Sequence, residues 1–160
     1  MKSGTYLDAF LAALGRTAAA SDVLGGNDVL DPPQTEFGYE STPANALVFA
    51  AMGVDGVHYA VLARDGEFDD ASPVIQVAPM DFDEPVVVLA DSFLDYLADG
   101  CGVARARIAS LLEAATPEPD AELLGILGRF QSGPLLESPR VDRMNAKWLG
   151  LVVPREHDHT

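Results

Sequence analysis

The residues best suited to acid–base or metal chemistry in this chain are three histidines, one cysteine and a surplus of carboxylates. His58 follows Asp55 by three residues, so the carboxylate could orient the imidazole as a general base, or the ring could bind a metal. A histidine in a strand beside a turn is more often a packed structural residue, and we expect that role for His58. The tail sequence His157-Asp158-His159 could hold a metal weakly, although a solvated tail fits it better.

Clustered carboxylates occur in two short stretches that could bind calcium or hydrolyse a glycoside. They are Asp69, Asp70, Asp81, Asp83 and Glu84. A calcium loop places oxygen ligands at alternating positions, with a glycine at the bend and a distal glutamate, and the stretch 81–85 lacks this frame. A glycosidase needs two carboxylates that meet in space, which the sequence neither requires nor excludes. A carboxylate-based hydrolase that also uses His58 is therefore the third-ranked function.

Several classes of catalytic and cofactor-binding motif are absent from the sequence. There is no Gly-x-Gly-x-x-Gly, no Gly-x-Ser-x-Gly and no zinc-type spacing of cysteine and histidine. The only lysines are Lys2 and Lys147, so a P-loop is excluded. Cys101 is a single cysteine, which excludes an intramolecular disulfide, fits a reducing compartment and predicts a small buried apolar residue. We therefore expect no catalytic residue, no metal and no cofactor.

The net charge of −15 is concentrated in one part of the chain. Residues 17–104 hold 16 acidic residues and one basic residue, Arg64, while the remaining acidic and basic residues cancel. Such a field repels nucleic acid and favours basic partners, although an acidic surface also serves solubility alone. Seven carboxylates in the loops before and after the third predicted strand are the expected partner-binding residues: Asp65, Glu67, Asp69, Asp70, Asp81, Asp83 and Glu84.

The elements that must position these groups are organised around a β-hairpin. Apolar, β-prone runs at 47–52 and 57–63 flank Asp55-Gly56, a dipeptide that favours a tight turn because glycine adopts positive φ without steric strain. Runs at 74–78 and 85–90 predict two further strands. The connections between these strands are short, which favours antiparallel neighbours over parallel strands.

Helices are expected on both sides of these strands in the sequence. The first is an amphipathic helix at 6–19, which explains the segment better than an export signal does. Further helices are predicted at 92–99, at 105–115 and after the break at 116–120. Asp91 is expected to cap the helix at 92–99, and Gly100 and Gly102 to end it.

The remaining segments complete a single α+β domain over residues 1–156. The stretch 21–40 predicts a long polar connection with a short strand near Val29, in which Phe37 and Tyr39 could pin the chain to the body. Residues 132–139 are expected to form a loop, 147–153 a last strand, and 157–160 a frayed tail. No run reaches the roughly 18 apolar residues of a membrane span, so we expect a soluble cytoplasmic protein.

The segment from Thr42 to Gly102 resembles the SUKH superfamily, whose founding members are Smi/Knr-type regulators of cell-wall synthesis. The resemblance lies in the order of several short motifs. These are Thr42-Pro43, Phe49-Ala50, Gly53-Val54-Asp55-Gly56-Val57-His58-Tyr59, Pro73-Val74-Ile75, Pro79-Met80, Leu89-Ala90-Asp91-Ser92-Phe93, Leu94 to Leu97 and Gly100-Cys101-Gly102. At the front, many members have a helix, then Leu-Pro, then a helix ending in Asn-Gly, whereas this chain has Asp31-Pro32-Pro33.

The resemblance implies a single α+β domain without a catalytic constellation. Many bacterial members are inferred immunity proteins that bind and neutralise toxins, often nucleases, and others are regulatory or scaffold proteins. We therefore rank an immunity protein for a basic toxin first, a regulatory or scaffold domain second and the hydrolase third. A toxin gene next to this one would separate the first two.

Overall fold

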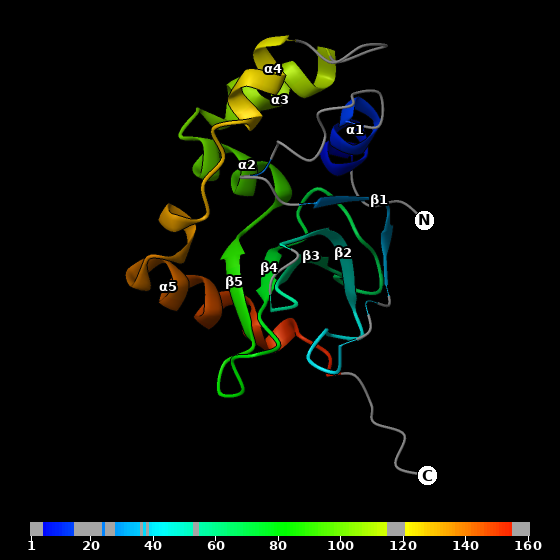
Figure 1. Ribbon diagram of the computed structural model, residues 1–160, viewed down its shortest axis with the longest axis vertical. Helices are drawn as coiled ribbons and strands as arrows, with labels where there is room; N and C mark the ends of the chain where they lie inside the picture. The colour runs from blue at the N-terminus through cyan, green and yellow to red at the C-terminus, as the bar shows by residue number, and fades with distance from the viewer. Residues whose placement is uncertain are drawn as a thin grey trace.

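The computed structural model describes residues 5–14, 24, 28–35, 37, 39–52, 55–114 and 121–154. It has an α+β fold, as predicted, with an antiparallel sheet flanked by helices (Figure 1). The strands are β1 (Asp28–Gln34), β2 (Ala46–Ala51), β3 (His58–Leu62), β4 (Val74–Val77) and β5 (Val86–Ala90). The helices are α1 (Thr5–Leu14), α2 (Phe93–Cys101), α3 (Arg105–Ala114), α4 (Ala121–Leu127) and α5 (Ser138–Trp148), with 3-10 turns η3 (Gly133–Leu136) and η4 (Leu149–Leu151).

The five strands pair in sequence order, and every pair is antiparallel. The four strands predicted from apolar runs are confirmed within a residue or two at each end. Between β2 and β3, Asp55 and Gly56 adopt φ of 54° and 74°, and the Met52 amide donates to the Val57 carbonyl at 2.8 Å. The predicted Asp-Gly turn is therefore confirmed, and successive loops lie at alternating ends of the sheet.

The edge strand β1 confirms the predicted strand near Val29 and is longer than expected. It is seven residues long and includes Asp31-Pro32-Pro33, which lies in the stretch predicted as a polar connection. Proline is tolerated on an edge strand because its missing N–H can face away from the sheet. The register against β2 shifts between Val29 and Gln34, which accommodates the irregular segment.

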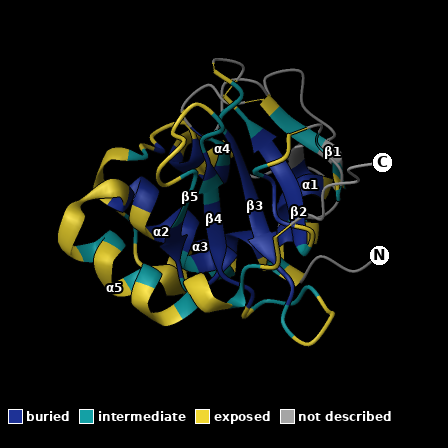
Figure 2. Ribbon diagram, turned by 90° about the horizontal axis from the view of Figure 1, so that it is seen from below, coloured by how far each residue is buried: buried dark blue, intermediate teal, exposed yellow. Residues whose placement is uncertain are grey.

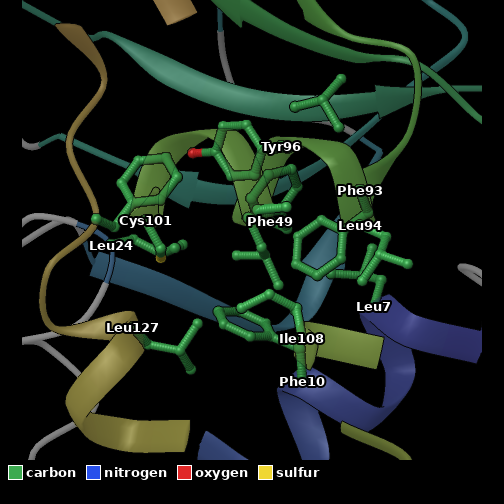
Figure 3. Packing of buried hydrophobic residues seen from close by; sticks show 14 of the residues in the cluster. Leu7, Phe10, Leu24, Phe49, Phe93, Leu94, Tyr96, Cys101, Ile108 and Leu127 are labelled. Atoms are coloured by element: carbon green, nitrogen blue, oxygen red, sulfur yellow. The ribbon is translucent and has the colours of Figure 1, made fainter. Parts of the chain in front are cut away.

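One face of the sheet forms the main core with the first four helices. Phe49 of β2 meets Phe93 of α2 edge-on, at 5.3 Å between ring centroids and 89° between planes. Phe10 of α1 packs on the same Phe93 ring at 5.1 Å, and Figure 3 shows these rings beside Ile108 of α3. Residues 15–19, predicted as the end of the first helix, and the break at 116–120 lie outside the described residues.

The ends of α2 differ from the prediction. Ser92, rather than Asp91, caps the helix, because its Oγ accepts the Asp95 backbone N–H at 3.1 Å. Gly102 ends the helix as expected, with φ of 68°. Gly100 instead lies inside the helix, where a Cβ would come within 2.1 Å of the Phe130 ring. Gly100 therefore permits close packing and does not end the helix.

The C-terminal region gives the largest correction. The predicted strand at 147–153 is wrong, because these residues end α5 and form η4 and a short extended segment, and the predicted loop at 132–139 contains η3 and the start of α5. Pro139 lies in the first turn of α5, where a missing N–H has no effect on helical bonding. Met144 and Trp148, four residues apart, pack against the apolar cluster on the second face of the sheet.

Helix α5 also covers the free edge of β5 (Figure 2). The Val88 amide donates to Asn145 Oδ1 at 2.8 Å, and Arg140 Nε donates to the Leu89 carbonyl at 3.0 Å. An exposed strand edge is a template for unwanted pairing. Here side chains of α5 form hydrogen bonds with backbone groups on the edge of β5. None of the described helices is long and apolar enough to cross a membrane. The tail at 155–160 lies outside the described residues.

Candidate functional site

His58 is a packed structural residue, as the sequence indicated. Its side chain is fully buried, with Nδ1 2.7 Å from the Gly56 carbonyl and Nε2 2.8 Å from Thr42 Oγ1. Because a carbonyl can only accept, Nδ1 carries the proton and Nε2 of the neutral ring accepts from the Thr42 hydroxyl. Burial lowers the pKa of His58, against a smaller opposing effect of the Gly56 hydrogen bond. Both ring nitrogens are thus occupied, which argues against His58 as a general base.

The single cysteine also has the expected structural role. Cys101 is buried and free, and burial raises the pKa of its thiol to about 11. A thiolate, the reactive form, is therefore scarce near neutral pH. Within the described part of the chain, no group of three His, Cys, Asp or Glu side chains is arranged to hold a metal ion. His157, Asp158 and His159 lie outside it.

The seven candidate partner-binding carboxylates divide between opposite ends of β4. Asp65, Glu67, Asp69 and Asp70 lie in the loop of residues 63–73, which joins β3 to β4. Asp81, Asp83 and Glu84 lie in the loop of residues 78–85, which joins β4 to β5. The fold therefore does not bring all seven together, and the two sets form separate surfaces.

Carboxylates of the 63–73 loop are engaged by the protein itself. Asp70 Oδ1 accepts the backbone N–H of Tyr6, in the first turn of α1, at 3.0 Å. Asp69 Oδ1 accepts the Ala71 amide at 2.8 Å, and its Oδ2 lies 3.5 Å from Arg64 Nη2. The first-turn amides of a helix have no partner within the helix, so Asp70 satisfies one of them across 64 residues of sequence. This loop thus braces α1 against the sheet.

A second tight turn shapes the 63–73 loop and was not predicted. Asp65 and Gly66 have φ of 52° and 79°, and Arg64 and Glu67 exchange two backbone hydrogen bonds of 2.8 and 3.0 Å. The dipeptide is again Asp-Gly, so the rule that identified the hairpin at residues 55–56 also applied here.

The 78–85 loop has the opposite character. Asp81 Oδ1 accepts the Glu84 amide within the loop at 3.1 Å, whereas the Asp83 and Glu84 side chains form no ion pair with any described residue. Phe82 lies between these carboxylates and is 86% exposed, and Met80 is 62% exposed. The loop extends at the foot of Figure 1, on the side of the sheet away from α1, α3 and α4.

A groove of about 440 Å³ lies between this loop and the chain that precedes β2. We call it the Tyr39–Phe82 groove, and its lining residues are Tyr39, Glu40, Ser41, Pro79, Asp81, Phe82 and Pro85. Sequence reasoning identified Asp81 but missed the other lining residues as parts of a site. Tyr39 was expected only to pin the connection to the body, which it does by stacking on His58 at 5.6 Å between ring centroids. The position of Phe82 between two acidic residues in the sequence could have indicated that it belongs to a binding site.

A second cleft, of about 310 Å³, contains charges of both signs. Arg105 pairs with Asp95 at 3.2 Å, while Lys147 Nζ and Trp148 Nε1 both donate to Asp91 Oδ1 at 2.8 Å. Burial alone would raise the pKa of Asp91, but the hydrogen bonds from Lys147 and Trp148, together with the positive charges of Lys147 and Arg140, outweigh it and lower the pKa. Because its charges are largely paired internally, this cleft offers a partner less net charge than the Tyr39–Phe82 groove does.

Comparison with known proteins gives no match to a family model, a curated protein or a solved structure. The resemblance of residues 42–102 to the SUKH superfamily therefore rests on the motifs quoted above.

Proposed function

We propose that this protein is a non-catalytic binding protein of the SUKH type, acting in the cytoplasm as an immunity protein that binds a basic toxin. The observation that carries the binding role is the 78–85 loop, in which Phe82 is 86% exposed among three carboxylates. Isolated exposed apolar residues are common, but this one adjoins a groove and a second exposed side chain, Met80.

The chemistry of this loop suits recognition of a basic protein surface. Aromatic side chains are frequent energetic anchors of protein interfaces, and charges around them set association rate and partner choice. Here the charged residues of the 78–85 loop are all acidic. The negative charge of residues 17–104 would steer a basic partner toward this surface from a distance.

Two features support binding over catalysis. His58 has no free ring nitrogen, which removes the base of the hydrolase hypothesis. The two carboxylate sets lie at opposite ends of β4, so no catalytic pair can combine one carboxylate from each set. The immunity role itself rests on the family resemblance, and a regulatory or scaffold role would use the same surface.

The test is affinity capture with the tagged full-length protein from lysate of its native host, at low and high salt. We expect a basic protein that binds at low salt and associates more slowly as the screening length falls to about 10 Å at 0.1 M. Co-expression then separates the two roles, because an immunity protein restores growth to cells that express the captured protein. A captured protein that is harmless to cells would instead indicate the regulatory role, and an acidic or uncharged partner would contradict the proposal.

A further inference from the structure

The Tyr39–Phe82 groove has a specific combination of walls. Tyr39 provides one aromatic wall, Phe82 another, and Pro79 and Pro85 contribute apolar surface between them. The charged side chains among its lining residues are Glu40 and Asp81, both acidic. Its volume of about 440 Å³ lies within the range of small-ligand pockets, about 300–1,000 Å³.

One wall of the groove is held in place before any ligand arrives. The Tyr39 ring stacks on the buried His58 ring with an interplanar angle of 23°, and Phe37 packs on His58 at 4.6 Å. Gly56 lies against the Tyr39 ring so closely that a Cβ would come within 2.7 Å of it. A ring fixed in this way loses little conformational entropy on binding, which favours affinity.

Aromatic faces together with carboxylates recognise a cation that is also planar. The arginine guanidinium stacks on aromatic rings, is more weakly hydrated than an ammonium group and donates in a fork that matches a carboxylate. Lysine offers a compact, strongly hydrated charge without a flat face. Charge complementarity and shape therefore favour arginine as the occupant.

We propose that the Tyr39–Phe82 groove receives an arginine side chain presented by the basic partner protein. This inference rests on the proposed function and specifies the partner's chemistry at its contact point. The Phe82 ring closes over the guanidinium, Asp81 and Glu40 supply the negative charge, and Asp83 and Glu84 attract the basic residues that flank the arginine.

The test uses the isotope-labelled full-length protein and three short peptides that differ at one central position. The peptides carry arginine, lysine or citrulline, the last being a neutral analogue of arginine with nearly the same shape. We expect the arginine peptide to shift the amide resonances of residues 39–41 and 79–85. Binding should weaken roughly threefold to tenfold with lysine, which lacks the flat face and the fork of the guanidinium. It should weaken further with citrulline, which lacks the charge needed for a cation–π contact.

Two substitutions at Phe82 separate the aromatic contribution from simple apolar contact. Phe82→Leu should retain apolar surface but lose the part of the preference for arginine over citrulline that the Phe82 ring supplies, while Tyr39, Asp81 and Glu40 keep the rest. Phe82→Ala should lose binding at this groove. Both are expected to fold, since the side chain is 86% exposed. Leu136→Ala is the matched control, because Leu136 is also an exposed large apolar residue, at 41%, outside the groove, and it should bind all three peptides like the parent.

The proposal is overturned if arginine and citrulline peptides bind equally, or if the shifts fall on residues 63–73. It is also overturned if the parent protein self-associates in sedimentation and Phe82→Ala does not, because the groove would then be covered by a second copy of the chain. If the captured partner binds Phe82→Ala normally but not a variant with reversed charges in the 78–85 loop, the groove assignment fails while the proposed function stands. If the peptides behave as expected but the captured partner binds without this loop, the proposed function fails and the groove remains an arginine site.

Discussion

The loops at the two ends of β4 are similar in composition and opposite in role. In the 63–73 loop, Asp69 and Asp70 accept backbone N–H groups, and Asp69 also pairs with Arg64. In the 78–85 loop, Asp83 and Glu84 extend into solvent beside an exposed Phe82. A carboxylate that holds another element of its own protein in place, as Asp70 holds α1, is needed there for stability. An exposed carboxylate next to an aromatic residue can instead act on a partner. The difference teaches that a count of acidic residues does not locate a binding surface.

The largest effect should come from reversing charge in the 78–85 loop. Asp83→Lys with Glu84→Lys should weaken binding of the captured basic partner roughly a hundredfold at low salt, because like charges would face each other across the interface. The matched control is Asp65→Lys with Glu67→Lys, which changes the net charge equally at the other end of β4 and should weaken binding by about twofold. Titrations by surface plasmon resonance measure both, with thermal melts to verify folding. Equal losses in the two variants would mean that only the overall charge matters.

Substitution of the glycine in each Asp-Gly turn compares the two ends of β4 through backbone strain. Gly56→Ala and Gly66→Ala each force an alanine into φ of 74° or 79°, which should reduce the free energy of unfolding by about 1–2 kcal/mol. Only Gly56→Ala should also weaken binding of the arginine peptide, because its Cβ would displace the Tyr39 ring, while a Cβ at Gly66 meets nothing within 4 Å. Urea unfolding and peptide titration measure the two effects. If Gly66→Ala weakened peptide binding as much as Gly56→Ala, displacement of the Tyr39 ring would not explain the weaker binding.

Removing a single carboxylate tests whether the 63–73 loop is structural. Asp70→Ala should lower the free energy of unfolding by about 1 kcal/mol, as loss of a helix cap does, because the Tyr6 N–H in α1 loses its acceptor. Asp83→Ala should change it by less than about 0.5 kcal/mol, as at ordinary surface positions. Denaturant titrations of both variants and the parent give the comparison. An equal change in both would refute the contrast drawn between the loops.

The smallest effect is the pH dependence of stability that arises from His58, the residue on which Tyr39 stacks. Burial lowers the pKa of His58 below its ordinary 6.5, so the unfolded chain takes up this proton first as pH falls. The contribution of His58 to stability is therefore full above pH 6.5 and decreases below it, with a slope of at most about 1.4 kcal/mol per pH unit for one proton. Unfolding measured from pH 7.5 to 5.5 should show a shallower slope for His58→Gln than for the parent. Identical slopes would mean that His58 binds its proton equally well in both states.

Local pattern was sufficient to predict much of this fold. The strands β2 to β5, the turn at residues 55–56 and the helices α1 to α3 follow from period, turn chemistry and amphipathic spacing, all of which act between residues close in sequence. The buried roles of His58 and Cys101 followed from residue type and context. The Asp65-Gly66 turn was equally predictable from the same dipeptide rule.

Tertiary structure alone decided the other features. The apolar run at 147–153 satisfies a strand pattern, but α5 and η4 are favoured because Met144 and Trp148 cover the second face of the sheet. The prolines of β1 are compatible with a strand only because it lies at the edge of the sheet. Whether a carboxylate braces the fold or faces a partner depends on which N–H groups come within about 3 Å of it, and for Asp70 that group lies 64 residues away. Distances of that kind arise from packing between distant segments, which the spacing of residues along the chain does not encode.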